Sequence, residues 1–152
     1  MKQIALGYNG YLQDYDGRMP MISTGEQGWA DSMQPYLKSW QVFQCPMEKE
    51  PPKPLSSDYF LNARVEGAPR NKIPFGGQTI LLGEGLDNGA PNSHFSELPL
   101  DWKSDENSPA RRHLDGANYA FVDGHVRWLK PEKISVQMPQ KSRRPIATFT
   151  VR

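Results

Sequence analysis

"RRHLDGANYAFVDGHVRWLK", residues 111–130, is the stretch of sequence that decides the fold. Its second half places Asp123 and Gly124 between two runs of aromatic and β-branched residues. An Asp-Gly pair flanked in this way is typical of a two-residue hairpin turn. The sequence therefore predicts an antiparallel two-stranded hairpin over residues 117–129.

A two-residue turn also predicts the register of this hairpin. The facing pairs would be Val122 with His125, Phe121 with Val126, and Tyr119 with Trp128. We expect one face to pack into the core, formed by Tyr119, Phe121, Val126 and Trp128. The other face would carry Ala120, Val122, His125 and Arg127. On this face His125 is expected to be an exposed or lightly hydrogen-bonded residue beside the turn, in preference to a catalytic base.

His113 precedes Asp123 by ten positions, which gives the pattern H-x9-D-G. If Asp115 and Gly116 formed a tight hairpin turn, His113 and Asp123 would lie too far apart to hydrogen bond, at ~3.4 Å per residue along the sheet. If residues 111–117 folded back across the hairpin, the imidazole could donate to Asp123 and order the turn. Both arrangements are architectural, and the sequence leaves them open.

Two helices are expected ahead of the sheet. Ile4, Tyr8, Tyr11, Leu12 and Tyr15 form an apolar stripe at helical spacing, and Asp14, Asp16 and Gly17 are expected to end that helix. "MKQIA" offers no N-cap residue, so either a helical segment precedes Met1 or this is a frayed terminal helix. A second stripe contains Trp29, Met33, Tyr36, Leu37 and Trp40, with a capping box predicted at Thr24 and Gln27 and a kink or break at Pro35.

Residues 57–65 and 78–85 are expected to be strands, and the second ends at Glu84 in a continuous apolar run. The Pro-rich segment "KEPPKP" is predicted to be an exposed loop, and residues 86–110 a long surface loop with one helical turn. No internal repeat occurs, which indicates a single domain.

Composition excludes several classes of protein. The 152 residues contain 18 Lys and Arg against 17 Asp and Glu, so no overall field favours nucleic acid. The basic residues Lys141, Arg143 and Arg144 are interpreted as a solvated tail. One cysteine rules out an intrachain disulfide framework, and no apolar run approaches the ~20 residues that span a bilayer. The chain as given is expected to be a soluble domain.

Catalytic and metal sites receive weak support from the sequence. Cys45 lies between Gln44 and Pro46 and is predicted to be a buried, inert thiol. His113, His125 and Cys45 lack the close pairing typical of zinc ligands, so we predict no metal site of that kind. Calcium is the remaining option, with oxygen ligands from the acidic loop and from the end of the preceding strand. The candidates are Asp101, Asp105, Glu106, Asn107 and Glu84, although a solvated acidic loop is the favoured interpretation.

The 111–130 stretch resembles the C-terminal signature of the prepilin-type H-x9-DG family of pseudopilin-like proteins. "KQIALGYNGYLQDYDGRMP" is similar to that family's junction between stem and head. "WADSMQPYLKSWQVFQCP" is similar to its helical segment leading to Phe-x-Cys-Pro, and "TILLGEG" to its strand ending in Glu. The likeness covers most of residues 2–130, and the last twenty or so residues match nothing that we can place.

This resemblance implies an α+β fold in which an N-terminal helix packs on a small antiparallel sheet with long loops. Residues 1–16 would be the C-terminal half of the stem helix, and residues 17–152 the globular α+β head. The resemblance also implies a non-enzymatic pilin or pseudopilin subunit of a type II secretion or type IV pilus-like envelope machine. His113, Asp123, Gly124, His125 and Glu84 would be structural motif residues. Partners would be other such subunits, through the stem helix, and an assembly platform.

Members of the family begin with a prepilin peptidase site and an apolar transmembrane helix. The resemblance therefore favours an upstream helical segment, so that the full-length form would be anchored in the cytoplasmic membrane with its head outside. Calcium binding by relatives of secretion pseudopilins makes a calcium-stabilised head one option. The alternative function is an extracytoplasmic head that binds a glycan or protein through exposed aromatic residues such as Trp102 and Phe95.

Overall fold

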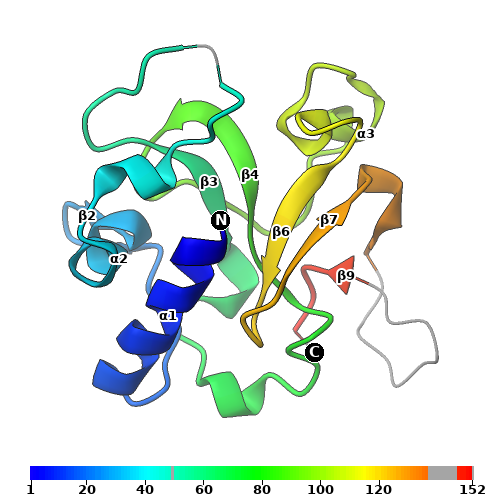
Figure 1. The fold of residues 1–152 in the computed structure, drawn as a ribbon. Helices are drawn as coiled ribbons and strands as arrows, with labels where there is room; N and C mark the ends of the chain where they lie inside the picture. Colours follow the sequence, from blue (N-terminus) through cyan, green and yellow to red (C-terminus); the bar gives the residue numbers. More distant parts are fainter. Residues whose placement is uncertain (49, 137–146, 152) are drawn as a thin grey trace.

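The computed structural model describes residues 1–48, 50–136 and 147–151, and its central feature is a five-stranded sheet (Figure 1). The strand order is β5-β3-β4-β6-β7. These strands are β3 (Ser57–Asn62), β4 (Ile80–Gly89), β5 (His94–Phe95), β6 (Ala117–Phe121) and β7 (Val126–Leu129). The basic cluster predicted at Lys141, Arg143 and Arg144 lies outside the described residues.

The predicted α+β class is confirmed, but the sheet is mixed. Within this five-stranded sheet, all neighbouring strands pair antiparallel except β3 and β5, which run parallel through Leu61 with His94 and Asn62 with Phe95. Two smaller two-stranded sheets join β1 (Ser23–Thr24) to β2 (Gln27–Gly28) and β8 (Ile134–Ser135) to β9 (Ala147–Thr148). Strands β3 and β5 can run parallel because the long connection between them, residues 63–93, contains the antiparallel strand β4.

Both faces of the sheet are covered. Helix α1 (Lys2–Asp14) and helix α2 (Trp29–Leu37) pack with each other and with one face, where they bury a core that includes Ile4, Tyr8, Trp29, Met33 and Phe43. The other face packs against the short helix α3 (Asp101–Ser104) and the segment that follows β9, with Phe60, Tyr119, Phe121, Trp102 and Phe149 in a second core. Figure 1 shows α1 and α3 on opposite sides of the sheet.

Helix α1 follows its predicted stripe. Ile4, Tyr8, Tyr11 and Leu12 are buried, and Tyr15, just past the helix, is half exposed and stacks on Tyr11 at a ring-centroid distance of 4.1 Å. Met1 makes no side-chain hydrogen bond to the first turn. Within the described residues, no helix is both long enough and apolar enough to cross a membrane.

The predicted capping box of the second helix is wrong. Thr24 and Gln27 face each other across the β1-β2 hairpin, whose turn uses Gly25 at a φ of 63°. Helix α2 begins after Gly28, whose backbone N–H donates to the Asp31 carboxylate at 2.7 Å. As predicted, Pro35 lies near a break, because α2 ends at Leu37 and a separate 3-10 turn, η1 (Trp40–Phe43), follows.

Two strand boundaries differ from the sequence prediction. Strand β3 ends at Asn62, where the side-chain carbonyl accepts from Arg64 N and begins a 3-10 turn, η2 (Ala63–Val65). Strand β4 continues to Gly89, so the first part of the predicted 86–110 loop is a strand. Its extension is held by the pairing of Ser57 with Gly89 and by the hydrogen bond from Asn88 N to Asp58. Beyond it lie β5, α3 and the 3-10 turn η4 (Pro109–Arg111).

The predicted hairpin is present, but its register is shifted by one residue. The pairs are Ala120 with Val126, Tyr119 with Arg127, Asn118 with Trp128 and Ala117 with Leu129. The loop has three residues, 122–124, because Phe121 N donates to His125 O and Gly124 N donates to Phe121 O. Only Gly124 of the two turn residues has a positive φ, 94°, whereas a two-residue type I′ turn requires both.

This shift changes which side chains reach the core. Val126 packs with Ala120 and Val122 on the α1 face, away from Tyr119 and Phe121. Trp128 is 42% exposed, so its predicted place in the core is wrong. Both faces of β6 are buried, because α1 covers one and the second core covers the other.

Candidate functional site

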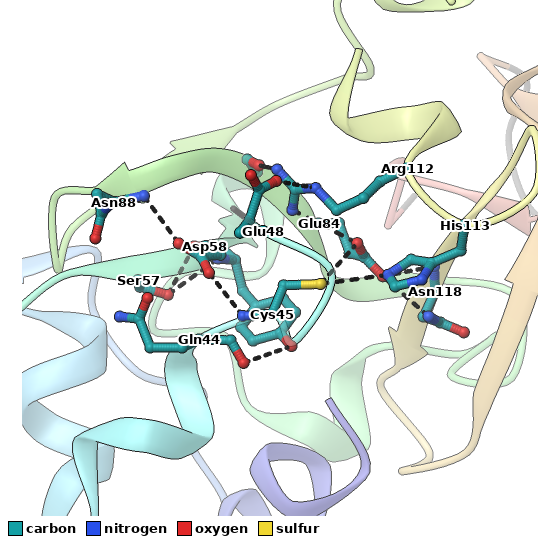
Figure 2. A network of polar contacts seen from close by, with 12 residues as sticks. Gln44, Cys45, Glu48, Ser57, Asp58, Glu84, Asn88, Arg112, His113 and Asn118 are labelled. Atoms are coloured by element: carbon teal, nitrogen blue, oxygen red, sulfur yellow. Dashed lines mark hydrogen bonds and ion pairs between the residues drawn. The ribbon is translucent and has the colours of Figure 1, made fainter. Parts of the chain in front are cut away.

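Three segments that are far apart in the sequence meet at one polar cluster beside β4 (Figure 2). The His113 Nε2 atom lies 2.8 Å from Glu84 Oε1 and 3.4 Å from Cys45 Sγ. Cys45 Sγ also donates to Glu84 Oε2 at 3.8 Å. We call Cys45, Glu84 and His113 the Cys-Glu-His cluster. In the described part of the chain it is the one group of three or more His, Cys, Asp or Glu side chains close enough to share a metal ion.

Cys45 is held by the segment that follows the 3-10 turn Trp40–Phe43. Its backbone N–H donates to Asp58 Oδ2 at 2.6 Å, and its side chain lies in the core beside α1. Burial raises the pKa of the Cys45 thiol, and the nearby Glu84 and Asp58 carboxylates raise it further, against the lowering effects of a Met47 backbone hydrogen bond and of Arg112. The predicted buried thiol is confirmed, since Cys45 is 5% exposed. Its contact with His113 was not expected.

Glu84 lies on β4 and is 1% exposed. Its Oε1 atom accepts from Asn118 N at 3.2 Å and from Asn118 Nδ2 at 2.9 Å, so the adjacent strand β6 fixes the carboxylate. Its Oε2 atom lies 3.5 Å from Arg112 Nη1. A carboxylate buried this deeply requires such partners, because an isolated charge in the interior is costly.

His113 is positioned by a tight turn. Leu114 and Asp115 both have positive φ values, and His113 and Gly116 exchange two backbone hydrogen bonds across them. Trp128 Nε1 donates to His113 O at 2.7 Å, which ties this turn to β7. The turn falls one residue earlier than the Asp115-Gly116 turn considered from the sequence. It directs the imidazole inward, toward Glu84 (Figure 2).

Negative charge is in excess around the cluster. The Glu48 carboxylate pairs with Arg112 Nε and interacts electrostatically with Asp87, Asp58 and Glu84. Burial raises the pKa of Glu48 although Arg112 opposes the shift, and burial also raises the pKa of Asp58 against its two backbone hydrogen bonds. Arg112 offsets part of this charge. Four carboxylates, those of Glu48, Asp58, Glu84 and Asp87, therefore act on this region against the guanidinium of Arg112, counted over the described residues.

The geometry differs from that of a nucleophile–base–acid relay. In such a relay the nucleophile contacts one imidazole nitrogen and the acid orients the ring through the other. Here Cys45 Sγ and Glu84 Oε1 both approach the same atom, His113 Nε2. The thiol pKa is raised, whereas an activated nucleophile requires a lowered one. Instead, the thiol of Cys45, the carboxylate of Glu84 and the imidazole of His113 converge on one point.

The sequence left open whether His113 contacts Asp123. In the structure the two side chains contact different residues. His113 contacts Glu84 and Cys45, whereas the Asp123 carboxylate contacts His125 Nδ1 at 2.6 Å and accepts from His125 N at 3.1 Å. The His125 ring also stacks on Phe121, with ring centroids 4.3 Å apart. His125 is therefore a partly exposed residue that closes the turn at Gly124, as predicted.

The predicted calcium candidates of the 101–107 loop do not join this cluster. Asp101 is exposed at the start of α3, and the Asp105 carboxylate accepts from Asn107 N at 2.9 Å. Glu106 is exposed in the same loop. Glu84 lies with Cys45 and His113 instead. The acidic loop is thus organised by its own backbone contacts.

The aromatic residues that favoured a ligand-binding head are core residues. Trp102 is 6% exposed, and the half-buried Phe95 packs against it with ring centroids 5.0 Å apart. Phe95 also packs edge-on against Phe60. These rings therefore give no support to the alternative function.

Comparison of the chain with models of known protein families, with curated proteins and with solved structures finds no match. Functional inference therefore rests on the residues and their geometry. Sequence reasoning singled out His113 and Glu84 but missed their association with Cys45, and it missed Arg112, Glu48, Asp58 and Asn118 altogether. The only sequence signal for the association is that the Cys-Pro, Gly-Glu-Gly and H-x9-D-G segments all belong to the quoted resemblance.

Proposed function

We propose that this chain is a non-enzymatic structural subunit of the pilin and pseudopilin type, belonging to a type II secretion or type IV pilus-like envelope machine. In this role its head lies outside the cytoplasmic membrane. Its partners are other such subunits and the assembly platform, with no nucleic acid involved. The full-length form is anchored through a helix upstream of the residues described.

One observation carries the proposal: the motif residues that suggested the family serve the architecture of the head. His113 and Glu84 join the segment before β6 to strand β4. Cys45 contacts both side chains and so connects the segment after η1 to the same point. Asp123 and His125 close the β6-β7 turn. The residues that carry the resemblance therefore stabilise the same fold, as expected if the motifs specify a scaffold that family members share.

A second observation concerns helix α1. One side of this helix is buried against α2 and the sheet, while Leu6 on its outer side is 57% exposed. A groove between α1, the end of α2 and η1 is lined by Gln3, Leu6, Gly7, Gly10, Tyr36, Leu37 and Val42. A large apolar side chain beside a groove is suited to contact with another helix, which subunits bundled through their stems would provide.

The proposal is tested by cross-linking in the cells that encode the protein. We would introduce Leu6→Cys into the full-length gene product and add a membrane-permeant bismaleimide. We expect a covalent dimer in the membrane fraction, because each altered chain offers one accessible thiol. The unaltered chain is the first control, because its cysteine is buried. Ser104→Cys is the matched control, because Ser104 is exposed on α3 across the sheet from α1.

A Leu6→Cys protein that stays monomeric under conditions that cross-link a known pilin would contradict the proposal. A direct check comes from the gene. The proposal requires codons upstream of Met1 for an apolar segment of ~20 residues preceded by a prepilin cleavage site. An upstream reading frame without such a segment would reject the assignment independently of cross-linking.

A further inference from the structure

We propose that Cys45, Glu84 and His113 form a binding site for a zinc ion, with a water molecule as the fourth ligand. The inference does not depend on the proposed structural role, because any function of the head is compatible with such a site. It begins from the convergence of a sulfur, an oxygen and a nitrogen donor, which all lie within 4.8 Å of one another.

The donor set favours zinc. Zinc binds cysteine thiolate, imidazole and carboxylate, usually in tetrahedral geometry. Magnesium and calcium prefer oxygen ligands alone, which excludes them as the matched ion here. The three side chains therefore select a borderline-soft divalent ion.

The separations are close to those of a tetrahedral site. Zinc–ligand bonds of about 2.0–2.3 Å place neighbouring ligand atoms roughly 3.3–3.7 Å apart in a tetrahedral site. The observed separations are 3.4 Å from Cys45 Sγ to His113 Nε2, 3.8 Å from Cys45 Sγ to Glu84 Oε2, and 2.8 Å from His113 Nε2 to Glu84 Oε1. Adjusting them requires shifts of less than about 1 Å, which side-chain rotation provides.

The ligands are held by groups behind them, which is a regular feature of metal sites. Two Asn118 N–H groups donate to the Glu84 carboxylate, and Asp58 accepts from the Cys45 backbone. The His113 carbonyl accepts from Trp128 Nε1. These contacts fix the three ligands before an ion arrives and lower the cost of ordering them.

The local charge also favours a cation. Four carboxylates interact with one another around the cluster, those of Glu48, Asp58, Glu84 and Asp87. Among the described residues, the guanidinium that opposes them is that of Arg112. Binding replaces the thiol proton of Cys45 by the ion, and that proton goes to solvent, so the thiolate becomes a ligand. The His113 side chain is 20% exposed, which leaves a route for the ion and for its water ligand.

The test uses Co²⁺ and Zn²⁺ as probes on the tag-free chain treated first with reductant and chelator. Cobalt bound to a thiolate gives a charge-transfer band in the near ultraviolet, and Cys45 is the chain's one cysteine. We expect this band to saturate at one cobalt per chain and to disappear on addition of one zinc. We also expect zinc to raise the melting temperature progressively with its free concentration, since it binds the folded state.

Variants then assign the ligands. Cys45→Ser should abolish the charge-transfer band, and His113→Gln and Glu84→Gln should each weaken cobalt binding at least about tenfold. His125→Gln is the matched control, because His125 lies at the β6-β7 turn and contacts Asp123 instead. Its cobalt affinity should stay unchanged.

The unaltered chain decides the question even if the variants fail to fold. Absence of the thiolate–cobalt band, together with equal melting temperatures in zinc and in chelator, would overturn the proposal. Equal loss of binding in His125→Gln and His113→Gln would overturn the assignment of the ligands. Neither result would bear on subunit assembly, which is tested separately by cross-linking.

Discussion

His113 and Cys45 are 68 positions apart in the sequence, yet the Nε2 atom of His113 lies 3.4 Å from the Sγ atom of Cys45. Glu84 lies between their segments along the chain and contacts both side chains. This contact connects the loop before β6 to the loop before β3 across strand β4. The stability of the fold therefore depends on a buried polar junction as well as on its two apolar cores.

Replacing Glu84 by Gln should destabilise the fold by about 3 kcal/mol, because the new amide N–H₂ would face groups that are themselves donors. Asn118 donates to Oε1, and Cys45 and Arg112 approach Oε2. Urea unfolding monitored by circular dichroism measures the change. Glu26→Gln, at an exposed position, is the matched control and should stay within about 0.5 kcal/mol of the unaltered chain.

The two histidines of the quoted stretch should differ in their effect on stability. His113→Ala removes contacts to buried Glu84 and Cys45 and should cost about 2–3 kcal/mol. His125→Ala removes an exposed pair with Asp123 and a stacking contact with Phe121, and should cost about 1 kcal/mol or less. Urea unfolding of chelator-treated samples measures the two changes in unfolding free energy. Equal losses for the two variants would show that the buried junction has been misjudged.

Cys45 should react slowly with iodoacetamide in the folded chain. Burial raises the pKa of its thiol and restricts access, so we expect the native rate near pH 7.5 to be at least about tenfold below the rate in urea. Mass spectrometry of chelator-treated protein follows the modification. An equal rate in the two solvents would indicate an open, activated thiol.

The raised pKa of Cys45 also predicts a pH dependence of stability. The folded state keeps the thiol proton to a higher pH than the unfolded chain does. This contribution is therefore fully present below the unfolded pKa of ~8.5 and is lost as the pH rises above it. The difference in unfolding free energy between the unaltered chain and Cys45→Ala should fall across that range, and a difference that grows with pH would contradict the sign.

Gly124→Ala should cost about 1–2 kcal/mol, because Gly124 has a φ of 94°, which an L side chain adopts only with strain. The nearest atom to an added Cβ would be 3.9 Å away, so the cost is a backbone effect without a clash. Gly76→Ala is the matched control, since Gly76 has no positive φ and its added Cβ would meet only ordinary contacts. Urea midpoints should fall for the first variant and change little for the second.

Tyr36 donates a hydrogen bond to Asp14 Oδ2 at 2.8 Å, which raises the pKa of the Tyr36 phenol to about 12. The folded state therefore favours the protonated phenol. The contribution of this group to the unfolding free energy is present below pH ~10, the ordinary pKa of tyrosine. It is lost as the pH rises toward about 12. Carbon-13 NMR of labelled tyrosine should show this titration, absent in Tyr36→Phe and shifted toward ~10 in Asp14→Asn.

Much of the fold could be predicted from short stretches of sequence. The apolar stripe of α1, the break after Pro35, a buried strand reaching Glu84 and the hairpin around Gly124 all follow from local periodicity and turn chemistry. The errors lie where neighbours in space override local preference. Thr24 and Gln27 form a strand pair instead of a cap, and β4 continues to Gly89 because β3 offers it a partner.

The candidate site was predictable only in part. His113 and Glu84 could be singled out as motif residues, but Cys45, between Gln44 and Pro46, carries no local sign of a helix N-terminus and is predicted to be an inert thiol. Its partners lie 39 and 68 positions away. Zinc ligands are usually recognised from close sequence pairs, and this spacing hides the cluster.

The sequence by itself determined that residues 117–129 reverse as a hairpin, that an apolar helix side begins the chain, and that Cys45 is buried. Only the tertiary structure decided the three-residue loop, which is fixed by hydrogen bonds from Val122 N to Thr79 O and from Asp123 N to Gly76 O. It alone decided that Cys45, Glu84 and His113 share one site. The physical reason is that periodicity and turn preferences act within a few residues, whereas the strand order β3-β4-β6 sets which distant side chains meet.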